Sequence, residues 1–229
     1  MGQMANAFEG VRAVLFDMDG TLVETNIDFP LMKREMVALA EKYGVPASEV
    51  EGMDILAIVE HTMARLEDAS RTYDARCARR EAYEQLESIE LVHCKDAKPV
   101  SGAVELLGAL RRSGIKLGIV TRNCRRAVEI SLKKAGITAD VLLTRDDVPN
   151  TKPHPNHLLE ALELLGVQPG EAVMVGDHLM DVQGGRAAGM ATIGFLRAER
   201  PDDFFDRSPP DLVVRDLREL LACVERLKK

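Results

Sequence analysis

The sequence predicts an α/β protein, with a parallel sheet carrying helices on both faces and an all-helical insertion after its first strand. Three observations support this fold. Short apolar runs rich in branched residues alternate with stretches whose apolar residues recur at helical spacing. A glycine follows several of the helical stretches, where it commonly ends a helix. One long stretch, from about residue 26 to residue 91, contains helical patterns but no strand-like run.

Six apolar runs are the expected strands. The first, at residues 11–16, stops abruptly at Asp17, and its last four residues are apolar on both faces, as in a buried parallel strand. The later runs cover residues 116–120, 139–143, 172–175, 191–195 and 212–214. Because these strands alternate with helices, we expect right-handed crossovers between neighbouring parallel strands.

The helical patterns fall into two groups. Those of the sheet domain cover residues 101–113, 125–135, 157–165 and 180–188. Those of the insertion cover residues 27–43, 48–69 and 73–89, and the turn Gly44–Val45–Pro46 ends the first of them. We therefore expect an α/β core made of residues 1–23 and 99–229, and a helical segment at residues 24–98.

The composition excludes several classes of function. Hydrophobic residues make up 46% of the 229 residues and charged residues 29%, which is ordinary for a globular protein with a sizeable core. The net charge of −7 and the aromatic content of 4% disfavour nucleic-acid binding, which needs a basic face or stacking platforms. A small phosphorylated ligand remains compatible, because a bound cation can neutralise its charge locally.

The sequence also indicates a cytoplasmic protein. Its four cysteines are scattered without a CxxC pair, which disfavours a zinc site and suits a reducing compartment. The first ten residues lack a basic stretch followed by an apolar run, so no secretion signal is expected. No apolar stretch approaches the length that a bilayer crossing needs, so no membrane association is expected.

Polar residues follow four successive expected strands, at the edge where open parallel sheets bind their ligands. They are Asp17, Asp19 and Thr21; then Thr121, Arg122 and Asn123; then Lys152; and finally Asp177 and Asp181. Any one group could be an ordinary turn, but four in succession favour a shared pocket. Aspartates crowded together raise their own pKa values and call for a hard cation, and Mg²⁺ is the natural occupant. A hydroxyl and an ammonium group, from Thr121 and Lys152, suit phosphate oxygens.

Four motifs in this arrangement resemble those of the haloacid dehalogenase superfamily. They are Asp17-Met18-Asp19-Gly20-Thr21-Leu22, Thr121 after Ile119-Val120, Lys152-Pro153, and Gly176-Asp177-His178-Leu179-Met180-Asp181. The resemblance spans the chain and points to the phosphatase branch with an inserted helical cap, alongside phosphoglycolate phosphatases and β-phosphoglucomutases. It implies a Rossmann-like core.

The resemblance implies a role for each motif residue. Asp17 is the expected nucleophile and forms an aspartyl-phosphate, while Asp19 protonates the leaving oxygen and then deprotonates water. Mg²⁺ is expected on the Asp17 carboxylate, the Asp19 carbonyl group and Asp177. The expected phosphoryl contacts are Thr121, the Asn123 amide and Lys152, with Asp181 orienting Lys152 or a metal-bound water.

Several further positions keep open roles. Gly20 is expected to let backbone amides face the phosphate. Arg122 is a candidate for binding the substrate's leaving group, or it lies in solvent. His178 stands where many relatives carry a small polar residue, and it is either a substrate contact or an ordinary surface histidine. His154 and His157, which flank Pro155 at the start of a helix, are further candidates for substrate contact.

The favoured function is a Mg²⁺-dependent phosphomonoester hydrolase acting on a small phosphorylated metabolite, as a monomer or a homodimer. A sugar-phosphate mutase is the enzymatic alternative, because it uses the same intermediate. A phospho-acceptor signalling module or a catalytically silent binding module is the alternative from another class, although the helical insertion has no place in a receiver domain. Asp19 disfavours dehalogenase chemistry, which lacks this second aspartate.

Overall fold

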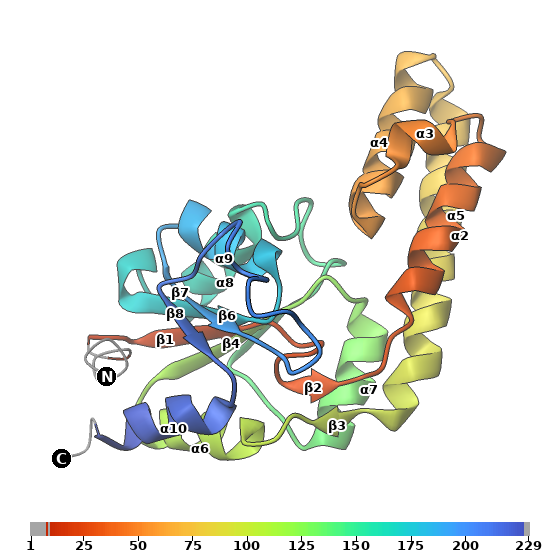
Figure 1. The fold of residues 1–229 in the computed structure, drawn as a ribbon. Coiled ribbons are helices and arrows are strands. Elements are labelled where there is room, and N and C mark those ends of the chain that lie inside the picture. The colour runs from red at the N-terminus through yellow and green to blue at the C-terminus, as the bar shows by residue number, and fades with distance from the viewer. Residues whose placement is uncertain (1–7, 9, 227–229) are drawn as a thin grey trace. The chain divides into compact units, whose positions relative to one another are not determined.

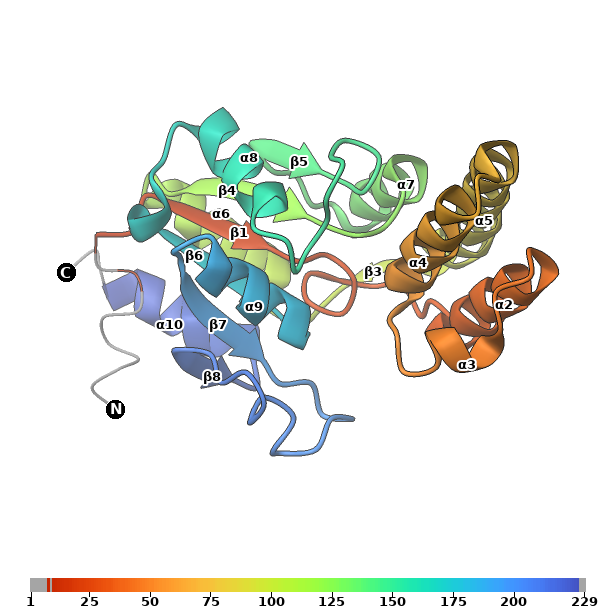
Figure 2. The same ribbon diagram turned by 90° about the horizontal axis from the view of Figure 1, so that it is seen from above.

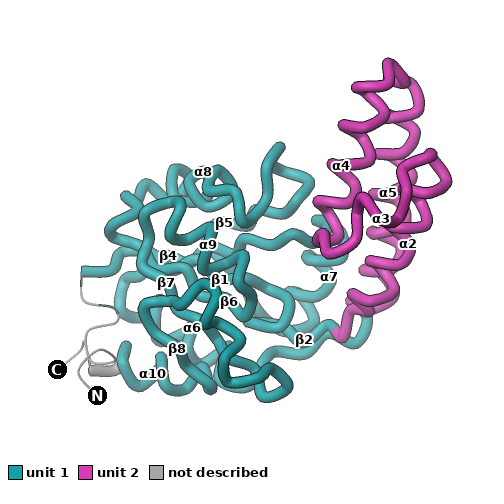
Figure 3. Tube along the Cα trace, turned by 45° about the horizontal axis from the view of Figure 1, so that its top comes forward, with its two compact units in different colours: residues 1–25, 95–229 teal, residues 26–94 magenta. Residues whose placement is uncertain are grey.

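The computed structural model describes residue 8 and residues 10–226, so the segment in which no secretion signal is expected lies mostly outside the described residues. The chain divides into two compact units (Figure 3). We call Met1–Thr25 together with Lys95–Lys229 the core unit, and Asn26–Cys94 the helical unit. Their boundaries fall a few residues inside the expected helical segment.

The core unit contains a six-stranded parallel sheet (Figure 1). Its strands lie in the order β5 (Val141–Leu143), β4 (Lys116–Val120), β1 (Ala13–Phe16), β6 (Ala172–Gly176), β7 (Ala191–Phe195) and β8 (Leu212–Val214). Each strand matches one of the apolar runs of the sequence, so the predicted fold class is confirmed. Phe16 pairs in register with Ile119 on β4 and Val175 on β6, which aligns the carboxyl ends of the three central strands.

Helices cover both faces of this sheet (Figures 1 and 2). Val14 and Phe16 of β1 face the layer of α6 (Ala103–Arg112), α7 (Arg125–Ala135) and α10 (Leu217–Arg226). Ala13 and Leu15 face the other layer, formed by α8 (Asn156–Leu165) and α9 (Leu179–Ala187). All four β1 side chains are fully buried, and burial of each large one contributes about 1.5–3 kcal/mol. This double burial explains why β1 has no polar face.

Two short strands of the core unit were not expected. β2 (Val23–Glu24) and β3 (Lys98–Pro99) form an antiparallel pair next to the two junctions between the units. Two residues are too few to show an alternating pattern in a sequence. Two short 3₁₀ helices, η1 (Cys94–Asp96) and η2 (Pro169–Glu171), precede β3 and β6.

The helical unit consists of α2 (Phe29–Lys42), α3 (Ala47–Val50), α4 (Ile55–Asp68) and α5 (Thr72–His93). Its core is an apolar cluster that includes Met32, Met36 and Leu86. The prediction of one helix over residues 48–69 is wrong, because the chain breaks after Val50. Gly52 adopts a φ of +82° there, and the Asp54 side chain accepts the Leu56 and Ala57 amides to begin α4 anew.

Two features of the whole chain bear on its environment. Among the helices of residues 10–226, none combines the length and the apolar composition needed to cross a membrane. The four cysteines all lie within the described residues and form no disulfide bond. Their thiols therefore add no covalent link to the fold.

Candidate active site

The carboxyl ends of the central strands bring the first two motifs together. The Asp17 amide donates to the Val175 carbonyl at 2.9 Å, which continues the β1–β6 ladder by one residue. The Thr121 amide donates to the Leu143 carbonyl at 2.9 Å, which does the same between β4 and β5. Because these strands are parallel and in register, the residues that follow them meet at one edge of the sheet.

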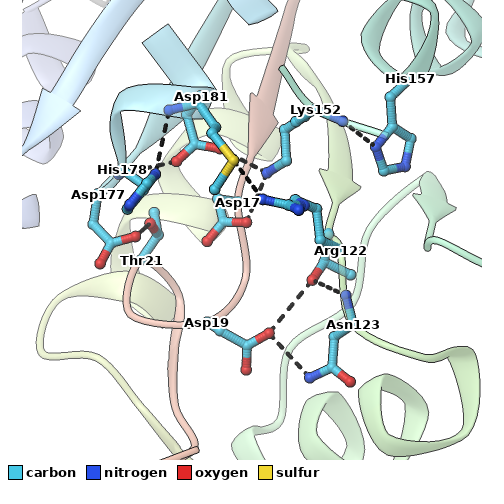
Figure 4. Close-up of polar contacts among 12 residues, drawn as sticks. Asp17, Asp19, Thr21, Arg122, Asn123, Lys152, His157, Asp177, His178 and Asp181 are labelled. Atoms are coloured by element: carbon cyan, nitrogen blue, oxygen red, sulfur yellow. Dashed lines mark hydrogen bonds and ion pairs between the residues drawn. The ribbon is translucent and has the colours of Figure 1, made fainter. Parts of the chain in front are cut away.

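A buried ammonium group links the residues of three motifs (Figure 4). Lys152 Nζ lies 2.7 Å from Asp17 Oδ1 and 2.7 Å from Asp181 Oδ1. The Lys152 side chain is 1% exposed and that of Asp181 4%, whereas Asp17 keeps 14% of its side-chain surface exposed. A buried cation in contact with two carboxylates is held far more firmly than a surface ion pair. The nucleophile candidate is therefore both fixed and accessible.

The fourth motif holds its two aspartates through local backbone geometry. Asp181 lies in the first turn of α9, and its Oδ2 accepts the His178 amide at 3.1 Å. His178 Nδ1 in turn accepts the Met180 amide at 3.3 Å, which completes a capping box. Gly176 leaves room for Asp181, because a β-carbon at Gly176 would lie 2.2 Å from Asp181 Oδ2. His178 thus has a capping role, which the sequence interpretation did not include.

Asp19 belongs to a separate hydrogen-bonded group beside this cluster (Figure 4). Its Oδ1 accepts the Thr25 hydroxyl at 2.7 Å, and its Oδ2 accepts the Asn123 side-chain amide at 3.1 Å and the Thr121 hydroxyl at 3.4 Å. The Asn123 backbone amide donates to Thr121 Oγ1 at 3.2 Å. Across the described residues, no hydrogen bond joins the Asp19 carboxylate to Asp17 or Lys152. The nucleophile and the acid–base candidate therefore have different partners.

Gly20 gives the first loop the shape that the site needs. Its φ is +88°, a conformation that residues with a β-carbon rarely adopt. A β-carbon there would lie 2.5 Å from Asp177 Oδ2 and 2.8 Å from Arg197 Nη1. The following residue, Thr21, is fully buried and its hydroxyl donates to Asp177 Oδ1 at 3.4 Å. The loop between Asp17 and Thr21 therefore packs directly against Asp177.

Burial dominates the electrostatics of the cluster. It raises the pKa of Asp17 well above its usual value, and the nearby carboxylates add to the shift while Lys152 opposes it. It raises the pKa of Asp177 to about 7, again helped by Asp181. Burial alone would lower the pKa of Lys152, but the charges of Asp17 and Asp181 outweigh it and raise that pKa. A carboxylate cluster with this excess of negative charge gains stability when it binds a cation.

Asp17, Asp177 and Asp181 could together hold a metal ion. One carboxylate oxygen from each lies within 4.8 Å of those of the other two. Carboxylates are the ligands of hard divalent cations such as Mg²⁺, which also retains several waters. The Asp19 carboxylate is not part of this group, and the binding of a metal by the Asp19 carbonyl group stays a prediction.

The remaining sequence candidates fall in different places. Arg122 lies in the loop after β4, and its guanidinium contacts Met180 Sδ at the start of α9 (Figure 4). The Arg122 carbonyl accepts a hydrogen bond from the buried Arg145 at 3.1 Å, which ties this loop to the residue after Thr144. His154 is exposed, and its Nδ1 accepts the Asn156 amide at 3.3 Å, so its contact is with the start of α8 and not with the acidic cluster.

Sequence reasoning missed two residues that contact the site, Thr25 and Arg197, and considered a third, His157, only as a contact to the substrate. Thr25 bonds Asp19, His157 bonds the Lys152 amide at 3.3 Å, and Arg197 lies against Gly20 and near Asp177. Thr25 and Arg197 stand outside every motif, and no spacing rule marks them. His157 was a candidate for substrate contact, whereas the structure buries its side chain completely and places its ring on the Lys152 amide.

Comparison with known proteins assigns the family. The model of the haloacid dehalogenase-like hydrolases matches residues 14–195. A pyrophosphatase PpaX of Bacillus mycoides is 31% identical over 224 residues, which cover 95% of this chain and 98% of the relative. Among solved structures, a HAD phosphatase from Thermococcus onnurineus has a TM-score of 0.60 and 31% identity, covering 93% of this chain and 97% of its own.

A predicted phosphoglycolate phosphatase from Haemophilus somnus shares the fold, with a TM-score of 0.60, 21% identity, and coverage of 93% of this chain and 97% of its own. The resemblance drawn from the four motifs is therefore confirmed, as is the prediction of an enzyme of the phosphatase type. The family match covers all four motifs, from the last residues of β1 to the end of β7. The chain belongs to the haloacid dehalogenase-like hydrolases.

Proposed function

We propose that this enzyme is a Mg²⁺-dependent phosphatase that hydrolyses a small phosphorylated metabolite through an aspartyl-phosphate on Asp17. The observation that carries the proposal is the contact of Lys152 Nζ with both Asp17 and Asp181, at 2.7 Å each, inside a cluster of three carboxylates. The partly exposed Asp17 carboxylate is thus surrounded by an ammonium group and by carboxylates that can bind a cation. Such an arrangement suits the transfer of a phosphoryl group.

In the first step, an Asp17 oxygen attacks phosphorus and the bond from phosphorus to the leaving oxygen breaks. Asp19 donates its proton to that oxygen, which leaves as an alcohol. Burial raises the pKa of Asp19, so the proton is available closer to neutral pH than on an exposed aspartate. Hydrogen bonds from Thr25, Asn123 and Thr121 hold the Asp19 carboxyl group beside the site before the proton transfer.

In the second step, water attacks phosphorus of the aspartyl-phosphate and Asp19 takes the proton of that water. The Asp17–phosphorus bond breaks, and inorganic phosphate leaves. The same group thus acts first as an acid and then as a base. Such proton transfer contributes about 10²- to 10⁴-fold to the rate.

Three donors hold the phosphoryl oxygens as charge moves. They are the Thr121 hydroxyl and the Asn123 backbone amide, which follow β4, and the ammonium group of Lys152, which lies in the loop before α8. Asp181 keeps Lys152 in place through the 2.7 Å contact. Gly20 lets the first loop approach closely, and Arg122 binds the leaving group.

The residues of the cluster fit Mg²⁺. The Asp17 carboxylate, the Asp19 carbonyl and Asp177 would hold it, and the closely spaced carboxylate oxygens of Asp17 and Asp177 have the chemistry that a hard cation requires. When bound, the ion supplies positive charge to the phosphoryl oxygens and lowers the repulsion between them and Asp17.

We propose that the helical unit belongs to a cap that selects the substrate, and that this cap extends over residues 24–98. Relatives named pyrophosphatase PpaX and phosphoglycolate phosphatase make pyrophosphate and phosphoglycolate the first substrates to test. Cysteines without disulfide bonds suit a reducing compartment, and we place the enzyme in the cytoplasm, as a monomer or a homodimer acting on no nucleic acid.

The sharpest test is a phosphatase screen over a metabolite panel, with and without Mg²⁺, for the wild type and for Asp17→Asn. We expect turnover that needs Mg²⁺ and that disappears in the variant, because an amide oxygen is a poor nucleophile. Trapping of radiolabelled phosphate on the wild-type chain, and not on the variant, would support the covalent intermediate. Full turnover by Asp17→Asn would overturn the proposal.

Asp19→Asn separates acid–base chemistry from metal binding. We expect hydrolysis to fall by about 10²- to 10⁴-fold while Mg²⁺ affinity stays close to that of the wild type, because only the carbonyl group of this residue meets the metal. Titration calorimetry would measure the affinity. A lost metal site would contradict the assigned role.

No observation favours the mutase or a signalling module over hydrolysis. The mutase predicts exchange of phosphate between positions of a hexose phosphate, and product analysis separates it from release of inorganic phosphate. The signalling module predicts a phospho-protein that persists, whereas hydrolysis predicts one that turns over rapidly.

A further inference from the structure

His157 connects the helix α8 to the loop that carries Lys152. The side chain is fully buried in the first turn of α8, and its Nδ1 accepts the Lys152 backbone amide at 3.3 Å (Figure 4). The neighbouring residues Leu158 and Leu162 pack on the sheet with Leu15 of β1. The imidazole is therefore anchored by a helix that is itself fixed to the strand preceding the nucleophile.

The imidazole remains a neutral acceptor throughout the physiological pH range. Burial lowers its pKa to about 3, and the Lys152 charge adds to this, while the Leu143 and Thr144 carbonyls act in the opposite direction. Because Nδ1 accepts a hydrogen bond, the ring proton sits on Nε2. That nitrogen is buried, and the ring lies near the Leu143 and Thr144 carbonyls.

Lys152 needs anchoring at both ends. A lysine side chain has four rotatable bonds, and its ammonium must stay between Asp17 and Asp181 while charge develops on the phosphoryl group. Asp181 restrains the Nζ end at 2.7 Å. His157 restrains the backbone end through the Lys152 amide. Together these contacts fix where the ammonium can lie.

We propose that His157 is a positioning residue for the reaction and acts only through Lys152. Its complete burial prevents contact with a substrate, and its neutral ring cannot serve as an acid near pH 7. This inference rests on the role proposed above for Lys152. The positioning effect follows because a small displacement of a group that contacts the transition state has a large effect on rate.

A double-mutant cycle tests the proposal with p-nitrophenyl phosphate as substrate. The variants are His157→Leu, which removes the acceptor; His157→Asn, whose amide oxygen can replace Nδ1; Lys152→Met; and the double variant His157→Leu/Lys152→Met. Leu162→Ala is the matched control, because it weakens the packing of the same helix and leaves the acceptor of the Lys152 amide in place. Thermal unfolding of every variant shows that the assays are run on folded protein.

We expect His157→Leu to lower kcat by about 10- to 100-fold, the range typical of residues that orient a site group. His157→Asn should recover most of that loss, and Leu162→Ala should lower stability with little change in kcat. In the Lys152→Met background, His157→Leu should cause no further loss of kcat, because the ammonium group through which His157 acts is already absent.

Equal losses from His157→Leu in the two backgrounds would overturn the proposal, and so would a normal kcat in the folded single variant. A normal kcat in Lys152→Met, by contrast, would show that the role proposed for Lys152 is itself wrong. The two failures are therefore distinguishable in one experiment.

Discussion

Lys152 and Asp181 form an ion pair that is almost completely buried, with Nζ 2.7 Å from Oδ1. Asp181 makes a second contact through Oδ2, which accepts the His178 amide at 3.1 Å at the start of α9. One carboxylate thus links the ammonium of the third motif to the helix of the fourth. Asp181, which is not one of the expected metal ligands, is therefore held in place by hydrogen bonds from both sides.

Asp181→Asn should damage both stability and rate. The substitution leaves a buried ammonium with one carboxylate partner instead of two, at a cost of about 1–3 kcal/mol in the free energy of unfolding. The looser Lys152 should lower kcat by about 10- to 100-fold. Urea unfolding and steady-state kinetics measure the two effects, with the exposed Asp203→Asn as control. A stability loss with unchanged kcat would show that Asp181 serves the fold alone.

The metal-free enzyme should lose stability as pH rises. Asp177 has a pKa of about 7 in the folded chain, against 3.8 as its ordinary value. Between these values the folded chain binds more protons than the unfolded chain, so the free energy of unfolding falls as pH increases from about 4 to about 7. Mg²⁺ replaces the proton on the cluster, so its stabilising effect should grow over the same interval.

Thermal unfolding with chelator and with Mg²⁺, at pH 5 and pH 8, measures this effect. We expect Mg²⁺ to raise Tm by several degrees more at pH 8 than at pH 5. A change of about 1 kcal/mol in the free energy of unfolding shifts Tm by roughly 2–4 °C in a protein of this size. In Asp177→Asn the difference between the two pH values should shrink. A Mg²⁺ effect of equal size at both pH values would contradict the assignment of Asp177 as the titrating ligand.

The parts of this fold that depend on local pattern could be predicted from the sequence. β1 was recognisable because both its faces are buried, and that same property placed it at the centre of the sheet. The meeting of Asp17, Lys152 and Asp181 followed from parallel strands ending at one edge. The motif order added the identity of the family.

The rest depended on tertiary contacts that no local pattern records. The break between α3 and α4 needed the capping bonds of Asp54 to outweigh helix propensity. The pairing of Asp19 with Thr25 depends on how the chain folds back after Gly20. The Arg197 position depends on the path of the chain after β7, where the sequence offers turn residues and charges but no period.

Arg197→Ala should strengthen Mg²⁺ binding. The guanidinium lies against Gly20 and near Asp177, and its charge lowers the pKa of that carboxyl group while also repelling a nearby cation. Removal should tighten Mg²⁺ binding by about two- to fivefold, the effect of a partly screened charge. Arg207→Ala, in an exposed part of the same connection, is the control. Titration calorimetry measures both, and weaker binding in Arg197→Ala would refute the electrostatic explanation.

Gly20→Ala should displace Asp177. Gly52→Ala is the control, because it introduces similar backbone strain without crowding any other residue. Both glycines have a positive φ, +88° and +82°, so each substitution costs about 1–2 kcal/mol in strain. The new β-carbon at Gly20 would lie 2.5 Å from Asp177 Oδ2, whereas the one at Gly52 would meet nothing within 4 Å. Urea unfolding should therefore show similar strain in the two variants, with an additional loss in Gly20→Ala.

Only Gly20→Ala should weaken Mg²⁺ binding, because Asp177 must move to make room for the added carbon. Calorimetric titration at pH 8, where Asp177 is ionised, gives the comparison its greatest contrast. We expect at least a tenfold difference in affinity between the two variants, in the range found when groups that orient a metal ligand are disturbed. Equal affinities would mean that the first loop can yield without moving Asp177, and that the close packing of Gly20 does not determine the geometry of the metal site.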